Sequence, residues 1–115
     1  STIKDPYSFN KYQKGGENIM HIQQVSVRNM ESSRGNLVPN QFIIKVKSHD
    51  LNQVGFDMVY FQSYNSIIAV KESPKGQVTI DQNKWDYSVT TGKYRNQFLG
   101  EDKKTTAGKI KKRGI

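Results

Sequence analysis

Hydrophobic and polar residues alternate through the middle of the chain with the period of two that a half-buried strand requires. The alternation is clearest over residues 41–48, where apolar side chains face one way and lysines the other: Phe42, Ile44 and Val46 against Lys45 and Lys47. Other segments rich in β-branched and aromatic residues predict further strands, over residues 21–28, 57–64, 66–71 and 77–81.

The segments between these strands predict short turns and one longer loop. Residues 29–40 contain Ser, Gly, Asn and Pro and are typical of a loop. Asn65 permits a turn between two strands, and residues 73–76 place Pro and Gly as a reverse turn requires. This spacing favours an antiparallel meander.

The pattern changes at Ser88, where a short helix is predicted to begin. Tyr94 and Phe98 are four residues apart, so they can dock one face of the helix on the sheet. Three residues are competent N-caps, and a glycine follows where a helix commonly ends: Ser88, Thr90 and Thr91, then Gly100. Residues 105–113 could add another turn or two of helix, but Gly108 and dense like charge predict that this part is frayed.

Together these elements predict the α+β class: a small, mainly antiparallel sheet of about four or five strands, with one short C-terminal helix and flexible ends. At 115 residues, 34% of them hydrophobic, the chain holds one domain with a modest core. The aromatic residues assigned to that core are Phe42, Phe61, Trp85 and Phe98. The predicted organisation is a flexible N-terminal segment, a single globular domain and a basic C-terminal tail, over residues 1–18, 19–100 and 101–115.

Composition excludes several kinds of protein. Without cysteine the chain has no disulfide and no thiolate metal site. No apolar run approaches the ~18 residues of a membrane-spanning helix, so no contact with a membrane is expected. The sequence also begins without a hydrophobic signal region, and a cytoplasmic protein is therefore expected.

Positive charge is concentrated towards the end of the chain. Residues 89–115 hold eight of the 18 lysines and arginines but only two of the ten acidic residues, so they carry six of the eight net positive charges. A cationic end on a near-neutral body indicates a polyanionic partner such as nucleic acid.

The candidate contacts to nucleic acid are cations for phosphates, a hydroxyl near the start of the predicted helix, and tyrosine rings for stacking. They are Lys93, Arg95, Tyr64, Tyr87, Thr91, Lys103, Lys104, Lys109, Lys111, Lys112 and Arg113. The alternative is structural: the hydroxyls only cap the helix, the rings pack inside, and the cations are solvated. A nucleotide-hydrolysing P-loop is excluded at Thr91-Gly92-Lys93, because Tyr87 and Tyr94 stand where that motif needs a glycine and a hydroxyl residue.

Catalytic groups are scarce in the sequence. His21 and His49 are the only histidines, and they do not have a metal-ligand spacing. Asp81 and Asp86 flank Trp85 without a third group that would suggest a general acid–base pair. We therefore predict a protein that is not an enzyme and that has no cofactor and no metal.

Three blocks of sequence are unusual enough to compare with known families: PNQFII at residues 39–44, preceded by Arg34-Gly35-Asn36, YFQSYNSIIA at residues 60–69, and WDYSVTTGKYRNQFLG at residues 85–100. With these blocks the chain resembles a family of short proteins and domains from bacteriophages, plasmids and related mobile elements of bacteria. The resemblance covers about residues 33–100 and carries no catalytic residue over. It implies a bacterial host cell as the setting.

The leading hypothesis is a non-enzymatic nucleic-acid-binding accessory protein of a phage or plasmid, whose basic C-terminal region contacts phosphates. The alternative is a phage- or plasmid-encoded inhibitor of a host defence protein, such as a nuclease guided by nucleic acid, in the manner of an anti-CRISPR protein. A homo-oligomeric structural component is a third hypothesis. The sequence leaves open DNA against RNA, strandedness, any protein partner, and the oligomeric state.

Overall fold

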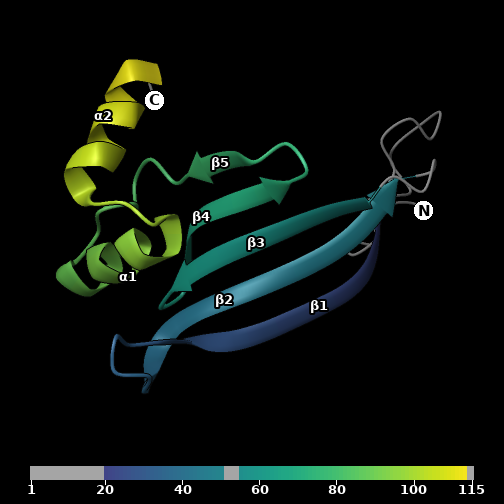
Figure 1. The fold of residues 1–115 in the computed structure, drawn as a ribbon, viewed down its shortest axis with the longest axis horizontal. Helices are drawn as coiled ribbons and strands as arrows, with labels where there is room; N and C mark the ends of the chain where they lie inside the picture. The colour runs from purple at the N-terminus through teal and green to yellow at the C-terminus, as the bar shows by residue number, and fades with distance from the viewer. Residues whose placement is uncertain (1–19, 51–54, 114–115) are drawn as a thin grey trace.

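The computed structural model describes residues 20–50 and 55–113, and an antiparallel sheet is its main element (Figure 1). The sheet has five strands in the order β1-β2-β3-β4-β5, so each strand pairs with the next along the chain. The strands are β1 (Met20–Glu31), β2 (Leu37–Asp50), β3 (Gly55–Ser63), β4 (Ser66–Ser73) and β5 (Gln77–Ile80). The predicted antiparallel meander is confirmed. The predicted N-terminal segment, residues 1–18, lies outside the described residues.

The first hairpin is longer than predicted. The loop expected over residues 29–40 is shorter at both ends, so its predicted bounds are wrong. β1 continues to Glu31, and β2 begins at Leu37. The short turn between them is closed by the Ser32 N–H, which donates to the Asn36 carbonyl at 2.8 Å. Most of the polar residues that suggested a loop, residues 32–36, do form this turn, whereas the residues on either side of them belong to the strands.

A bulge near the start of β2 accommodates the residues that hid this strand from sequence analysis. The pairing of β1 with β2 shifts register just after Asn29, whose side-chain amide donates to the Val38 carbonyl at 2.9 Å. Asn40 takes a positive φ of 66°, which asparagine tolerates better than most residues. Pro39 fits because β2 pairs with β3 only from Gln41 onward, so its missing N–H breaks no hydrogen bond to β3.

The predicted helix is confirmed as α1 (Val89–Leu99), and the structure selects its caps. Ser88 is the N-cap, because its hydroxyl accepts a hydrogen bond from the Thr91 N–H at 3.1 Å. Gly100 ends the helix in the left-handed conformation, with φ 70°, and its N–H donates to the Asn96 carbonyl at 2.8 Å.

The prediction of a single helix with a frayed tail is wrong, because a second helix, α2 (Lys103–Arg113), follows directly. Three acidic contacts explain why the basic segment folds. An Asp102 carboxylate oxygen accepts from the Thr105 N–H at 2.8 Å and so caps the helix start. The Glu101 carboxylate accepts from the Thr106 hydroxyl and from the Lys109 ammonium, each at 2.6 Å.

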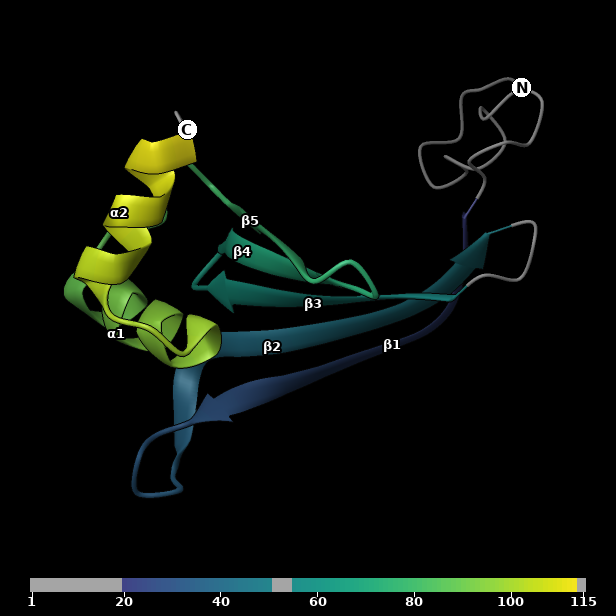
Figure 2. The same cartoon turned by 45° about the horizontal axis from the view of Figure 1, so that its top comes forward.

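The core lies between α1 and one face of the sheet, at the end of the sheet where both helices gather (Figures 1 and 2). The Phe98 ring of α1 stacks on Phe61 of β3, with the ring centroids 5.7 Å apart. The buried hydrophobic side chains are Met30, Ile43, Phe61, Ile68, Ala69, Tyr94 and Phe98. The rest of this sheet face extends beyond the helices (Figure 2).

Two of the four aromatic residues assigned to the core, Phe61 and Phe98, are buried as predicted. Phe42 and Trp85 are only half-buried, so for these two the assignment is wrong. The error at Phe42 has a geometric cause. Ile43, not Phe42, pairs across the sheet with Phe61 and therefore lies on the face that α1 covers.

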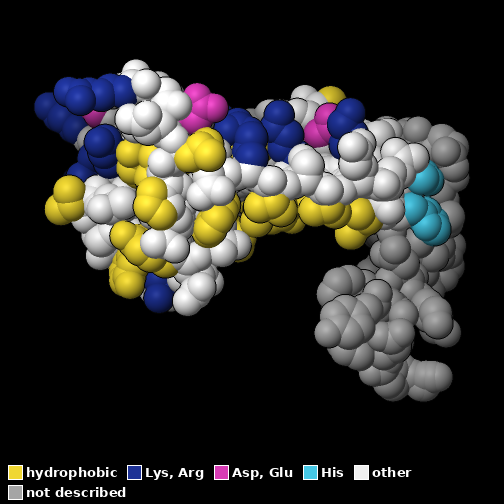
Figure 3. All heavy atoms as spheres, turned by 90° about the horizontal axis from the view of Figure 1, so that it is seen from below, with side chains coloured by type: hydrophobic (Ala, Val, Ile, Leu, Met, Phe, Trp, Pro, Cys, Tyr) yellow, Lys and Arg dark blue, Asp and Glu magenta, His cyan; other side chains and the backbone are white. Residues whose placement is uncertain are grey.

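The two sheet faces differ sharply in character. Residues paired across an antiparallel ladder lie on the same face, so the register assigns each side chain to one side of the sheet. The face that carries α1 bears lysine and arginine beyond the helix, whereas a row of hydrophobic side chains follows the opposite face (Figure 3). We call the first the helix face and the second the open face.

The contact between Phe98 and Phe61 should dominate the attachment of α1 to the sheet. Phe98→Ala should lower the free energy of unfolding by about 3–5 kcal/mol, because it removes a buried aromatic ring and leaves a cavity. Denaturant unfolding followed by circular dichroism measures the change. Val89→Ala, at an exposed position of the same helix, is the matched control and should change stability by less than about 0.5 kcal/mol. A loss of less than about 1 kcal/mol for Phe98→Ala would contradict this account of the core.

Candidate nucleic-acid interface

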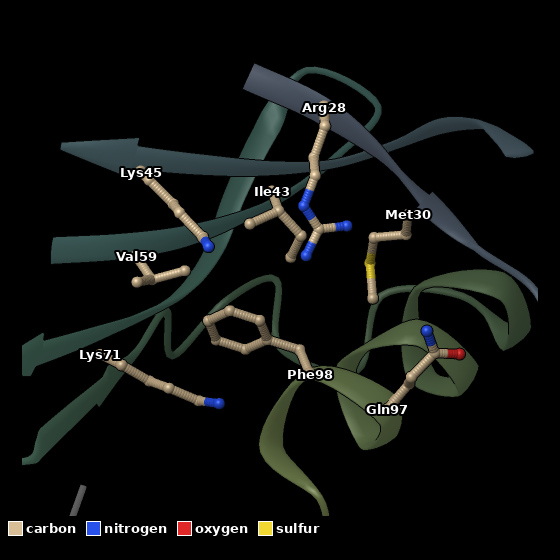
Figure 4. A pocket seen from close by; sticks show the side chains of 8 residues that line it. All are labelled: Arg28, Met30, Ile43, Lys45, Val59, Lys71, Gln97 and Phe98. Carbon is tan, nitrogen blue, oxygen red and sulfur yellow. The ribbon is translucent and has the colours of Figure 1, made fainter. Parts of the chain in front are cut away.

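A hollow of about 230 Å³ lies where the C-terminal half of α1 meets the helix face of the sheet (Figure 4). Its lining combines an apolar floor with long cationic side chains. The residues that line it are Arg28, Met30, Ile43, Lys45, Val59, Lys71, Gln97 and Phe98. We call it the cationic hollow.

Strand pairing brings the three cations of this hollow together from three different strands. Arg28 of β1 pairs with Ile43 of β2, and Lys45 of β2 pairs with Val59 of β3. Val59 in turn pairs with Lys71 of β4. All these residues therefore share the helix face, although 43 positions of sequence separate Arg28 from Lys71.

The cationic groups of the hollow converge on one space. The Arg28 guanidinium and the Lys45 ammonium point towards the same space beside Ile43 (Figure 4). The Lys71 ammonium lies 4.4 Å from the centre of the Phe98 ring, within the range of a cation–π contact. Among the described residues that line the hollow, none is acidic. Within residues 20–50 and 55–113, no ion pair involves Arg28, Lys45 or Lys71.

Arg28, Lys45 and Lys71 carry like charges around one hollow and therefore repel one another. An anion placed between them would remove that repulsion and would accept hydrogen bonds from both a guanidinium and ammonium groups. Phe98 is buried and is partly covered by Lys71, so its ring face is not free for a base to stack on. The chemistry of the hollow thus suits a phosphate rather than a nucleobase.

Arg95, one of the predicted phosphate contacts, is instead an interior residue with 1% of its surface exposed. One terminal nitrogen donates to the Trp85 carbonyl at 2.7 Å and to the Asp86 carboxylate at 3.2 Å. The other donates to the Asn96 side-chain oxygen at 2.8 Å. Its guanidinium carbon also lies 5.0 Å from the centre of the Trp85 ring. Arg95 therefore holds the segment before α1 in place.

Thr91 is likewise buried rather than presented to a ligand. Its hydroxyl is hydrogen-bonded to the Ser63 hydroxyl at 2.8 Å, which ties the first turn of α1 to the end of β3. The Ser88 hydroxyl is a second partner, at 3.0 Å. Thr91 therefore has a structural role: it fixes the first turn of α1 against the end of β3.

Acidic partners engage two of the predicted tail cations. The Lys103 ammonium lies 2.7 Å from the Asp86 carboxylate, and the Lys109 ammonium lies 2.6 Å from that of Glu101. The hydrogen bond from Lys103 holds the pKa of Asp86 below its ordinary value, and Arg95 lowers this pKa further. The remaining tail lysines, Lys104, Lys111 and Lys112, are exposed. The side chain of Arg113 lies outside the described residues.

The other predicted contacts lie on the surface but do not form one site with the cationic hollow. Tyr64 occupies the turn between β3 and β4, with a positive φ of 55°, and is partly exposed. Tyr87 is 56% exposed, with the Lys84 ammonium 5.1 Å from its ring centre. Lys93 is exposed on α1. These rings and cations can each meet a ligand only at the periphery of the helical end.

A second, wider hollow of about 630 Å³ brings together three of the predicted residues beside the N-terminal half of α1. They are Lys93, Arg95 and Lys103. Asp86 also lines this space and forms ion pairs with both Arg95 and Lys103. The positive charge here is therefore largely balanced, and the hollow is a weaker anion site than the cationic hollow.

The three cations of the cationic hollow were missed by the sequence analysis. Lys45 was correctly placed on the polar side of its strand, but nothing in the sequence joins it to Arg28 or Lys71. That juxtaposition depends on the register of β1, β2, β3 and β4, which a single sequence does not fix.

Within the described part of the chain, no helix is long and apolar enough to cross a membrane.

The fold and this surface define a class of protein: a small α+β domain whose antiparallel sheet is partly covered by α1 and partly cationic. Residues 25–114 match a family described as a family of unknown function, DUF8033. Because the match spans most of the chain, from within β1 to the end of α2, the protein belongs to this family. Neither the curated proteins nor the solved structures contain a match to the chain.

Acid should weaken the junction of α1 and α2 through Asp86. Since the fold lowers the pKa of this carboxyl, its contribution to stability is complete above the ordinary pKa and is lost as the pH falls through the folded value. Asp86→Asn should therefore lower the melting temperature at pH 7, and the difference from the unmodified protein should shrink below about pH 4. Asp57→Asn, at an exposed position of β3, is the control and should have little effect at pH 7. If Asp86→Asn lowers the melting temperature as much at pH 2.5 as at pH 7, to within about 1 °C, this role of Asp86 is contradicted.

Proposed function

We propose that the protein binds nucleic acid without catalysing a reaction, and that the cationic hollow on the helix face is the centre of its binding surface. The observation that carries this proposal is the convergence of Arg28, Lys45 and Lys71 on one hollow whose described lining has no acidic residue. Nucleic-acid backbones present phosphates at regular short intervals, and neutralising them releases counterions, which drives binding.

The exposed lysines of α2 extend this surface. Lys104, Lys111 and Lys112 are exposed, and α2 lies at the end of the sheet beside α1 (Figure 1). A strand bound in the cationic hollow could continue along the helical end and contact these side chains. Lysine contacts to phosphates carry little sequence information, so the binding is expected to be largely independent of sequence.

The residues that contact the ligand differ in part from those predicted from the sequence. Arg95 and Thr91 are committed to the interior, so they position α1 rather than touch a ligand. Tyr64 and Tyr87 remain available at the periphery for stacking on unpaired bases. The setting proposed from the sequence, a phage or plasmid product in a bacterial cytoplasm, is retained as part of the proposal.

The central contacts are tested by removing two cations from the hollow. Lys45→Gln/Lys71→Gln should weaken binding to a DNA duplex and to RNA, and should reduce the slope of log K against log salt by about two, since each phosphate contact contributes about one. Fluorescence anisotropy at several salt concentrations measures both quantities. Arg34→Gln/Lys75→Gln is the matched control, because it removes the same charge from exposed turns outside the hollow.

Equal losses for the two double variants would show that only net charge matters and would contradict a central role for the hollow. No binding by the unmodified protein even at low salt would overturn the function itself.

The alternative predicted from the sequence, an inhibitor of a host defence protein, is tested by a pull-down from nuclease-treated bacterial lysate. One stoichiometric protein partner would favour that alternative.

A further inference from the structure

The open face of the sheet carries a continuous apolar surface that no described residue covers. Cross-strand pairs place Val25 opposite Val46, and Val27 opposite Ile44. Further pairs extend the surface across β3 and β4, and the hydrophobic side chains on this face are Ile22, Val25, Val27, Phe42, Ile44, Val46, Phe56, Met58, Tyr60 and Val70. Figure 3 shows a row of hydrophobic side chains along the lower side of the sheet.

The exposure of this surface is greatest on β1. Ile22, Val25 and Val27 have exposed fractions of 64%, 53% and 61%. Single exposed aliphatic side chains are ordinary, but a contiguous patch that spans four strands is typical of a protein interface. Among the side chains that the structure describes on this face, the acidic one is Glu72 of β4, which pairs with Met58.

The size of the open face suits a partner of the same shape. Four strands spaced by about 4.8 Å, with seven residues at about 3.3 Å each, span roughly 20 by 23 Å, or about 450 Å². Two such faces packed together would bury roughly 900 Å², the size of a weak, reversible interface, just below the ~1,000 Å² at which stable specific interfaces begin. Twisted sheets pack face to face about 10 Å apart with their strands nearly aligned, so two copies of this face are compatible in shape.

Charge identifies the partner as a second copy of the chain. The protein carries a net charge of +8, so an acidic protein or a nucleic acid would be drawn to the helix face rather than to a nearly uncharged one. Two copies that met through their helix faces would oppose Arg28, Lys45 and Lys71 of each. Two copies that meet through their open faces keep these cations on opposite outer sides, separated by both sheets.

We propose that the open face is the self-association surface of the protein, and that two copies pack sheet on sheet with their cationic hollows directed outward. The interface is isologous, because each copy contributes the same apolar rows from β1, β2 and β3. In combination with the proposed function, on which this one consequence rests, the dimer holds two separate nucleic-acid segments, one on each outer face.

Self-association is tested first without nucleic acid, by sedimentation of the full chain between roughly 1 and 300 µM. The unmodified protein should shift from monomer to dimer over this range. Val25→Glu/Val27→Glu should raise the dissociation constant at least tenfold, because it places like charges inside an apolar interface. Gln24→Glu/Ser26→Glu is the matched control: it adds the same charge to the same strand on the helix face and should leave the dissociation constant within about threefold.

A second variant keeps the test decisive if the glutamates prevent folding. Val25→Thr/Val27→Thr retains the β-branched shape and should still weaken the dimer, because it buries two unpaired hydroxyls per copy. A monomer at every concentration overturns the proposal. A dimer that both open-face variants leave intact overturns it equally, and so does a dimer weakened as much by the control.

Bridging is then measured by capture of a fluorescent DNA duplex on beads that carry a second duplex. The unmodified protein should bridge the two, and Val25→Thr/Val27→Thr should bind each duplex but bridge several-fold less. An intact dimer without any DNA binding overturns the proposed function and leaves the interface standing. DNA binding by a protein that stays monomeric overturns the interface and leaves the proposed function standing.

Discussion

The packing of Phe98 on Phe61 decides how the rest of the molecule is arranged, because it selects the sheet face that α1 covers. Side chains alternate across a strand, so this choice also assigns every neighbouring residue to a side. With Ile43 and Phe61 beneath α1, Lys45 and Lys71 must emerge next to the helix. The apolar residues that alternate with these along β2, β3 and β4 must therefore lie on the opposite side of the sheet. The cationic hollow and the open face are therefore two results of one contact.

The charges of the C-terminal region divide into those that build the fold and those that remain available. Arg95, Lys103 and Lys109 bind acidic side chains and hold α1, α2 and the segment before them together. This use of cations explains how a segment rich in lysine forms a helix. The lysines left over add to a cationic surface whose centre lies on the sheet.

Sequence patterns predicted much of the fold but little of the candidate site. β-Branched and aromatic composition located β3 and β4 closely, and capping residues located α1, because both signals are local. The start of β2 was hidden by Pro39 and Asn40, whose effect depends on where the partner strand begins. The alternation in β2 was also read correctly, yet it could not reveal which side α1 would cover. Phe42 was consequently assigned to the core in place of Ile43.

The candidate site depends on information of the same non-local kind. The concentration of charge in residues 89–115 drew attention to Arg95, but burial and an ion pair with Asp86 can be seen only in the folded chain. Arg28, Lys45 and Lys71 have no local pattern that sets them apart from solvated lysines and arginines. Their significance comes from a register that spans four strands.

The central claim is that the helix face binds nucleic acid while the open face does not, and methyl NMR tests it most directly. The methyl groups of Ile43 and Val59 line the cationic hollow, whereas those of Ile44 and Val27 lie on the open face. On titration with a short DNA duplex or RNA at low salt, the Ile43 and Val59 signals should shift and the Ile44 and Val27 signals should not. Shifts confined to Ile44 and Val27, or no shift at any of the four, would contradict the account.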